Sequence, residues 1–329
     1  MPDKNPYRQT FQKTSTNCHS VLERDRSVRL IRVARSGHLK FGRSSSLLTF
    51  SLIFLLVSHA TSAADTFDIE FNRLGTATVE GNDVNVRLNQ VHFDNVVRDL
   101  GVAMAPKFMG PASTLGALGF EVGFELSWTD INETSTYWKN AVDSPDSTMQ
   151  TMQIHLRKGL PFSLEVGGTI THLFNSELWG VGLDVKFAML EGFRSLPDFA
   201  IRGNIHTILG ANDINILLSG GDAVLSKEFG IGGVLRVAPY IGYNLVYIHG
   251  SSHAITFFTE AAAGSGSGGC PNGTDKKLCS RVALFDDVDE IVHRGIIGFQ
   301  LVTTVLSVGF EIAIAKDTQT YTTHLGVEF

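Results

Sequence analysis

The sequence predicts an all-β fold: a transmembrane antiparallel up-and-down β-barrel of about ten strands, preceded by a short N-terminal helix. Three observations support this prediction. Apolar and polar residues alternate through many short segments, tight turns and longer loops separate these segments in turn, and charge is sparse. Only 18% of the 329 residues are charged, whereas soluble domains average about 25%.

The alternation is clearest in GALGFEVGFELSW, residues 116–128. Large apolar side chains take every second position, and Glu121 and Glu125 lie between them. Successive side chains of a strand point to opposite faces, so one face is apolar and the other is charged. A closed barrel in lipid needs an apolar exterior and leaves no strand edge unpaired. A secreted soluble β-sandwich is the alternative.

Ten such segments follow residue 114. Loops at 130–147 and 249–291 fall on one side, the second with a short hairpin expected to rise from it, and tight turns fall on the other. This arrangement and the even strand count are typical of outer-membrane barrels. The alternation blurs at 216–218, which predicts a bulge or a change of frame. Pro239 also breaks the pattern, because proline cannot donate to a strand ladder.

The front of the chain predicts export. The apolar run Leu47–Val57 is too short to span a bilayer as a helix, which needs about 20 residues, and it lies between basic and small residues. This is the layout of a signal peptide. We therefore expect residues 1–63 to be an N-terminal extension plus signal peptide, with the apolar region at 47–57. A buried core helix or a membrane anchor is the alternative.

The exported part is acidic. After residue 63 the chain carries 17 basic and 30 acidic side chains, a net charge of −13, which argues against nucleic acid as a partner. Cys270 and Cys279 remain as a pair in CPNGTDKKLC, and export predicts a disulfide between them. Two cysteines without a nearby histidine give too few ligands for a metal, so no metal or cofactor is predicted.

Residues 64–113 precede the barrel and are expected on its periplasmic side or as a plug. Residues 66–90 could form a hairpin, which would raise the count to twelve strands. FDNVVRDLG places Phe93, Val97 and Leu100 at helical spacing, with Gly101 as a C-terminal stop. Because a polar lumen disfavours an apolar stripe, the sequence favours a helix at the periplasmic mouth. A plug inside the lumen is the alternative.

The polar face of the barrel, residues 114–329, is expected to line its lumen with charged and histidine side chains of both signs. Buried charges must be paired, so these residues predict a structural network, and a barrel of this size leaves room for a narrow pore. The lumen-lining candidates are Glu121, Glu125, His155, Arg157, Glu165, Asp184, Lys186, Arg202, His206, Arg236, Arg294 and Glu311.

The chain ends in TYTTHLGVEF, in which Tyr321, Leu325, Val327 and the terminal Phe329 share one face. This segment resembles the C-terminal β-signal that bacterial assembly machinery recognises, and residues 114–329 resemble the small outer-membrane barrels of Gram-negative bacteria. The resemblance implies location in the cell outer membrane, with membrane lipid and the barrel-assembly machinery as partners. It does not imply an activity, because fold does not imply function.

The sequence therefore predicts a structural barrel or a narrow channel for small solutes or cations, and not an enzyme. The first alternative is an adhesion or binding barrel that acts through the 249–291 loop. The second is a membrane-embedded hydrolase, which barrels such as the omptin proteases show to be feasible. His249, His253 and His293 lie near acids at the loop end, but no serine-centred motif accompanies them.

Overall fold

The computed structural model describes residues 66–80, 83–259 and 279–329. The predicted extension and signal peptide at 1–63, and Cys270 with its predicted disulfide, lie outside these residues. Ten antiparallel strands form the barrel: β3 (Phe120–Asp130), β4 (Thr148–Leu160), β5 (Leu164–Leu173), β6 (Trp179–Leu190), β7 (Asp198–Leu209), β8 (Ile214–Ser226), β10 (Leu235–Ser252), β13 (Val288–Thr303), β14 (Leu306–Ile314) and β15 (Gln319–Glu328).

The sheet closes on itself because β15 pairs with β3, for example at Gly326 and Gly123. Each remaining strand pairs with its neighbours in chain order, and the three-residue β9 (Phe229–Ile231) extends one turn. The predicted ten-stranded antiparallel barrel is confirmed. Closure pairs every strand, so the polar backbone meets no lipid.

The outer wall of the barrel is apolar. Along β6, Val181, Leu183 and Val185 are exposed, whereas the residues between them face inward. Aromatic side chains gather on the outer face toward both ends, as they do where a barrel meets the two membrane interfaces. They include Trp179 and Tyr247 toward one end and Phe187, Phe299 and Phe329 toward the other.

The expected bulge at 216–218 does not occur. β8 keeps an unbroken register with both β7 and β10. The alternation blurs because the inward positions there, Ile216 and Leu218, are apolar and buried. A register shift lies instead between β6 and β7, at Ala188 and Leu190. Pro239 points outward and is exposed.

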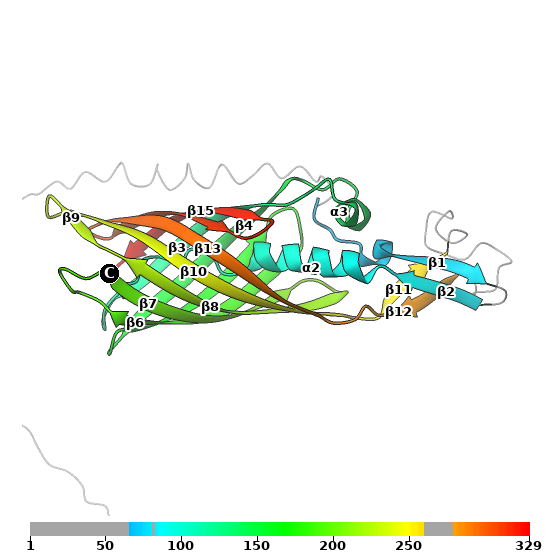
Figure 1. Cartoon of the computed structure of the whole chain (residues 1–329), viewed down its shortest axis with the longest axis horizontal. Coiled ribbons are helices and arrows are strands. Elements are labelled where there is room, and N and C mark those ends of the chain that lie inside the picture. The colour runs from blue at the N-terminus through cyan, green and yellow to red at the C-terminus, as the bar shows by residue number, and fades with distance from the viewer. Residues whose placement is uncertain (1–65, 81–82, 260–278) are drawn as a thin grey trace, which may run out of the picture. The chain divides into compact units, whose positions relative to one another are not determined.

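Two short hairpins lie at the barrel end opposite the C-terminus (Figure 1). The first pairs β1 (Gly75–Glu80) with β2 (Asp83–Leu88), and the second pairs β11 (Ile255–Phe258) with β12 (Ser280–Ala283). The N-terminal hairpin forms, but as a separate sheet, so the twelve-stranded alternative is wrong. The second hairpin is the one expected in the 249–291 loop, which is shorter than expected because β10 and β13 extend into it.

The helical elements of the described ranges are η1 (Phe71–Leu74), α2 (Gln90–Met104) and α3 (Thr136–Ala141) in the loop after β3. Asn89 caps α2 by accepting a hydrogen bond from the His92 amide. The helix continues three residues beyond Gly101, the expected stop, and its last turns are fully buried. Within the described residues, no helix has the length and apolar character needed to cross a bilayer as a helix.

Candidate functional site

The structure places the predicted lumen residues on the inner wall of the barrel. Eleven of the twelve candidates are buried, and Arg236 is the exception. Its exposed guanidinium lies at the end of the barrel near the C-terminus, where it pairs with Glu228 and Glu328. The eleven buried residues do not only face one another. Another part of the chain runs through the lumen between them.

Residues 90–115 pass through the barrel (Figure 1). α2 begins at the hairpin end, where Gln90 contacts Asp286, and its last turns pack against the inner wall. Residues 105–115 then continue along the lumen to the opposite end, where β3 begins. The structure thus shows a plug, and it places α2 at the end away from the tight turns, not at the mouth that the sequence favoured.

The helix lies in an apolar part of the lumen. Val97 and Leu100 are fully buried in one cluster with Ile216, Leu218 and Ile248 of the wall. The contact is close, because a Cβ on Gly101 would lie 2.8 Å from Ile248 and one on Gly250 would lie 2.5 Å from Val97. Glycine at these two positions lets helix and wall approach. The sequence did not predict an apolar lining at this end of the lumen.

A buried carboxylate fixes α2 to the loop that contains α3. Asp99 accepts hydrogen bonds from the Tyr137 hydroxyl at 2.9 Å and from the Trp138 indole at 3.0 Å. Arg98 Nη2 lies 3.1 Å from Asp99 Oδ1, and its positive charge balances that of the carboxylate. Burial, together with the nearby negative charge of Asp99, raises the pKa of Tyr137. The loop that contains α3 therefore covers α2 and holds it in position.

Residues 105–115 lie in a polar part of the lumen, where wall side chains bind their backbone. Carbonyl groups accept hydrogen bonds from cationic side chains: Pro106 from Arg294, Phe108 from Arg157 and Arg202, and Ser113 from Lys186. Amides donate to wall oxygens: Met109 to Glu311, Ala112 to Ser226, Thr114 to Glu191, and Leu115 to Glu165. Six of the twelve predicted lumen residues thus hold the plug.

Three of the four cations that hold the plug, Arg157, Lys186 and Arg202, also pair with wall carboxylates. Arg202 Nε lies 2.5 Å from Asp222 Oδ2, and Lys186 Nζ lies 3.0 Å from Glu165. On the plug itself, Lys107 Nζ donates to the Val102 carbonyl at 2.6 Å. That contact satisfies a carbonyl in the last turn of α2. The network therefore neutralises charge and satisfies backbone groups together.

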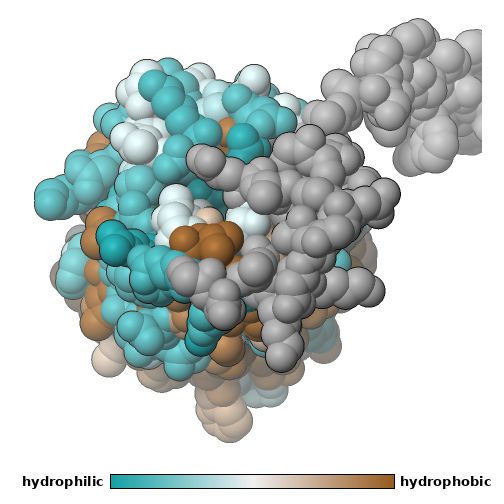
Figure 2. Space-filling view, turned by 90° about the vertical axis from the view of Figure 1, so that its right-hand side faces the viewer, coloured by the Kyte–Doolittle hydropathy of each residue, from teal (hydrophilic) through white to brown (hydrophobic). Residues whose placement is uncertain are grey.

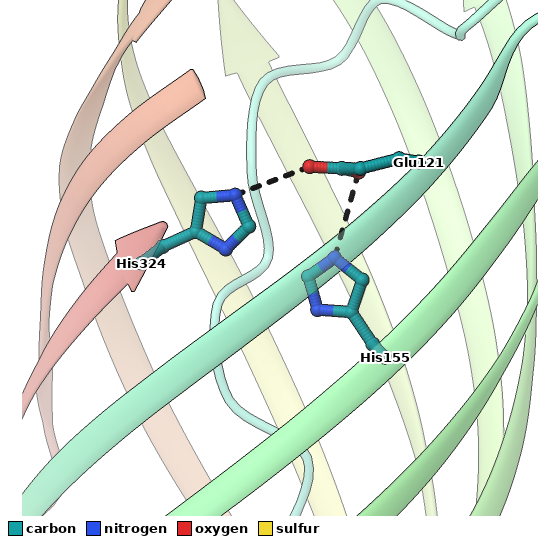
Figure 3. A group of neighbouring side chains, drawn as sticks. All are labelled: Glu121, His155 and His324. Atoms are coloured by element: carbon teal, nitrogen blue, oxygen red, sulfur yellow. Dashed lines mark ion pairs between the residues drawn. The ribbon is translucent and has the colours of Figure 1, made fainter. Parts of the chain in front are cut away.

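A second cluster lies where β3, β4 and β15 meet (Figure 3). His155 Nδ1 lies 2.6 Å from Glu125 Oε1, and its Nε2 lies 3.5 Å from Glu121. His324 Nε2 lies 3.1 Å from the other oxygen of Glu121. Phe108 of the plug stacks on His324 with ring centroids 4.1 Å apart. The four polar groups are buried, and Glu121, His155 and His324 could together hold a metal ion.

Glu121 also borders a cavity of about 240 Å³ at the C-terminal end of the barrel. Four glutamates and three cationic side chains line it, together with the plug at Ser113 and Thr114. It shares no residue with the pocket at the opposite mouth, which Phe67, Leu100 and Ile214 border. These two pockets do not join into a pore.

The arrangement offers little for hydrolysis. Ser307 Oγ lies 3.2 Å from His324 Nε2, but Ser307 and His324 are both buried and Phe108 covers the imidazole. His249 pairs with Asp289 at 2.7 Å on the exposed rim. Among the described residues, Asp289 is the hydrogen-bond partner of His249, and no serine or cysteine bonds to this histidine.

The residues of the predicted assembly signal lie along β15. Leu325, Val327 and Phe329 point outward and are exposed, with Tyr321 half-buried on the same face. The terminal residue exchanges two backbone hydrogen bonds with Phe120, at 2.6 and 2.9 Å. The end of the chain thus completes the pairing that closes the barrel.

Sequence reasoning offered a plug only as an alternative, and it missed the extended path of residues 105–115 and the cluster of Glu121, His155 and His324. No periodicity marks an extended plug, and the cluster joins residues up to 203 positions apart. A usable signal was the apolar inward face at 216–218, because an apolar patch in a charged lumen needs an apolar partner. The helical stripe of α2 is that partner.

The structure itself defines the class of protein: a closed, ten-stranded antiparallel barrel with an apolar exterior, the fold of outer-membrane barrels. A scan against models of protein families and a search of curated proteins gave no match.

Solved structures with similar folds do exist. Ail, the attachment invasion locus protein of Yersinia pestis, is 11% identical with a TM-score of 0.25, over 64% of this chain and 97% of Ail. The KdgM porin is 7% identical with a TM-score of 0.29, over 64% and 99% of the two chains. LpxR from Salmonella typhimurium is 8% identical with a TM-score of 0.30, over 62% and 99%. Likeness at this level carries no argument about activity.

Proposed function

We propose that this protein is an integral outer-membrane barrel that displays a binding surface at the hairpin end and keeps its own lumen closed. One observation carries the proposal: wall side chains bind the backbone of residues 106–115 on both its donor and its acceptor groups. A passive channel would have to release all of these groups. A closed, structured lumen suits an anchor.

At the hairpin end, α2 and the two hairpins are held together by specific side-chain contacts and form a defined surface. Phe93 of α2 stacks on Phe285 with ring centroids 4.4 Å apart, and Phe257 meets Phe285 edge-on. Arg281 of β12 pairs with Asp83 of β2 at 3.1 Å and so ties the two hairpins together. In the coloured part of this end, Figure 2 shows mostly hydrophilic residues with a small hydrophobic patch near the centre. Tight turns in outer-membrane barrels face the periplasm, so this end faces outward.

Labelling of intact cells tests the orientation. We expect a membrane-impermeant maleimide to label Asn85→Cys in β2 and not Ser195→Cys in the turn after β6, since both side chains are exposed at opposite ends of the barrel. The chain without an added cysteine gives the background. Equal labelling of both sites, or labelling of Ser195→Cys alone, contradicts the proposal.

Conductance tests the closed lumen. In planar bilayers we expect the wild-type barrel to show no stable openings, because the plug occupies the lumen. Steady ion-selective openings of the purified wild-type protein would instead support the narrow channel that the sequence suggested. Heat-modifiable migration on a gel checks that the protein tested is folded.

A further inference from the structure

We propose that Glu121, His155 and His324 form a binding site for Zn²⁺ that bridges the seam between the first and last strands of the barrel. The three residues come from three neighbouring strands, β3, β4 and β15 (Figure 3). This site is independent of the surface that the hairpins form, and its occupant would be a divalent ion that prefers imidazole and carboxylate ligands.

The spacing of the candidate ligand atoms suits zinc. Zn²⁺ binds histidine nitrogen and carboxylate oxygen at about 2.0–2.2 Å, so tetrahedral ligand atoms lie roughly 3.4 Å from one another. The two oxygens of Glu121 lie 3.1 Å from His324 Nε2 and 3.5 Å from His155 Nε2. Ligand atoms of all three residues lie within 4.8 Å of one another. The two imidazoles are parallel, at 2°, so one ring would have to tilt for both nitrogens to bind the same ion.

A buried nitrogen points to a missing ligand partner. His155 has no solvent exposure, yet its Nε2 makes no hydrogen bond to any of the described residues. Its Nδ1 lies 2.6 Å from Glu125, and a proton on Nδ1 leaves the Nε2 lone pair free toward Glu121. Zinc-binding histidines usually donate their second ring nitrogen to a carboxylate in this way. Glu125 is therefore a positioning residue, which also lies 3.8 Å from His324 Nδ1.

The fold makes room for this arrangement at Gly123, which lies between Glu121 and Glu125 on the same inner face of β3. A Cβ at Gly123 would lie 2.2 Å from His155 and 2.7 Å from His324. Only a glycine lets the two imidazoles occupy this space.

The positive charge of Arg157 also competes with an ion for the Glu121 carboxylate, because Arg157 Nη1 lies 3.8 Å from Glu121. That guanidinium is held by the Phe108 carbonyl.

An ion can reach the site from one end of the barrel. Glu121 borders the cavity of about 240 Å³ that opens beside the C-terminus. The carboxylates in that cavity outnumber its cationic side chains and favour a cation on the way in. A bound ion would join His324 on β15 to His155 on β4 across β3 and so reinforce the closure of the barrel.

The test uses the untagged full barrel, refolded in detergent, stripped with a chelator and titrated with Zn²⁺ against a chromophoric competitor. We expect one ion per chain with micromolar or tighter affinity, and a Co²⁺-loaded form with the visible absorption of a four-coordinate site, made by the three side chains and one water. His155→Gln and His324→Gln should each weaken binding at least tenfold. Glu125→Gln should weaken it by roughly tenfold while keeping the Co²⁺ spectrum, as loss of an outer-shell partner does.

His206→Gln is the matched control. His206 is also a buried histidine of the lumen. Within the part of the chain that the structure describes, its two ring nitrogens lack partners and no acidic side chain lies in ion-pair distance of it. This variant should bind zinc as the wild type does. The proposal is overturned if the folded wild type takes up no stoichiometric ion at micromolar Zn²⁺, a measurement that needs no variant. It is also overturned if folded His155→Gln and His324→Gln bind as tightly as the wild type.

Discussion

The two halves of the lumen hold the same N-terminal segment in opposite ways. At the hairpin end, α2 rests on aliphatic side chains such as Ile216, Leu218 and Ile248. Toward the C-terminus, residues 105–115 rest on arginine, lysine and glutamate side chains. Both halves are closed, but one is closed by packing and the other by hydrogen bonds.

The difference follows from what each conformation does with its own backbone. A helix satisfies its amides and carbonyls internally, so its surroundings can be apolar and gain from burying Leu100. An extended peptide leaves every amide and carbonyl to find a partner, and a buried polar group without one is costly. The charged wall supplies those partners. A lumen full of charge is therefore no sign of a water-filled pore.

The largest effect should come from reversing the character of the apolar half. Leu100→Asp removes aliphatic packing and buries a carboxylate without a partner, so we expect the helix to leave its position at a cost of more than about 4 kcal/mol. Planar-bilayer recordings should then show openings that the wild type lacks. Val91→Asp, at an exposed position of the same helix, is the control and should change nothing. A silent Leu100→Asp barrel would show that packing of α2 does not close the lumen.

A smaller effect should come from the polar half. Arg202→Met removes a hydrogen bond to the Phe108 carbonyl and leaves Asp222 without its cation. We expect a loss of about 3 kcal/mol in the free energy of unfolding, most of it from the stranded charge.

The double variant Arg202→Met/Asp222→Leu separates those two contributions, because it removes the stranded carboxylate and should recover most of the loss. Denaturant titration in detergent measures both variants. If the double variant is as unstable as the single one, the bond to the plug matters more than the charge balance.

The smallest effect should come at the edge of the polar half. The Thr114 hydroxyl lies 3.0 Å from Glu191, and Thr114→Ala should cost about 1 kcal/mol or less, whereas Thr114→Ser should be neutral. Burial opposes ionisation of Glu191, but hydrogen bonds from Ser163 and Thr114 outweigh it and lower the pKa of Glu191. A lowered folded-state pKa stabilises at neutral pH, and this contribution disappears as the pH falls through that pKa. Melting curves at neutral and acidic pH should therefore show the Thr114→Ala deficit shrinking in acid.

Much of the barrel could be predicted from the sequence. Alternation along segments such as β3 and β6 assigned the strands, the charged side chains to the inner wall and the apolar ones to the outside. Where the prediction failed, at 216–218, the pattern was sound and its interpretation was not: the inner face changes from polar to apolar because α2 packs there.

The sequence by itself determined which face each residue takes, because side-chain direction in a strand repeats every two residues and is a local property. The tertiary structure alone decided which inner residues meet. Glu125 lies opposite His324, almost 200 residues away, only because β15 closes against β3 in one register. The path of residues 105–115 through the lumen was also beyond the sequence, since an extended segment carries no period and its position depends on partners supplied by the whole closed wall.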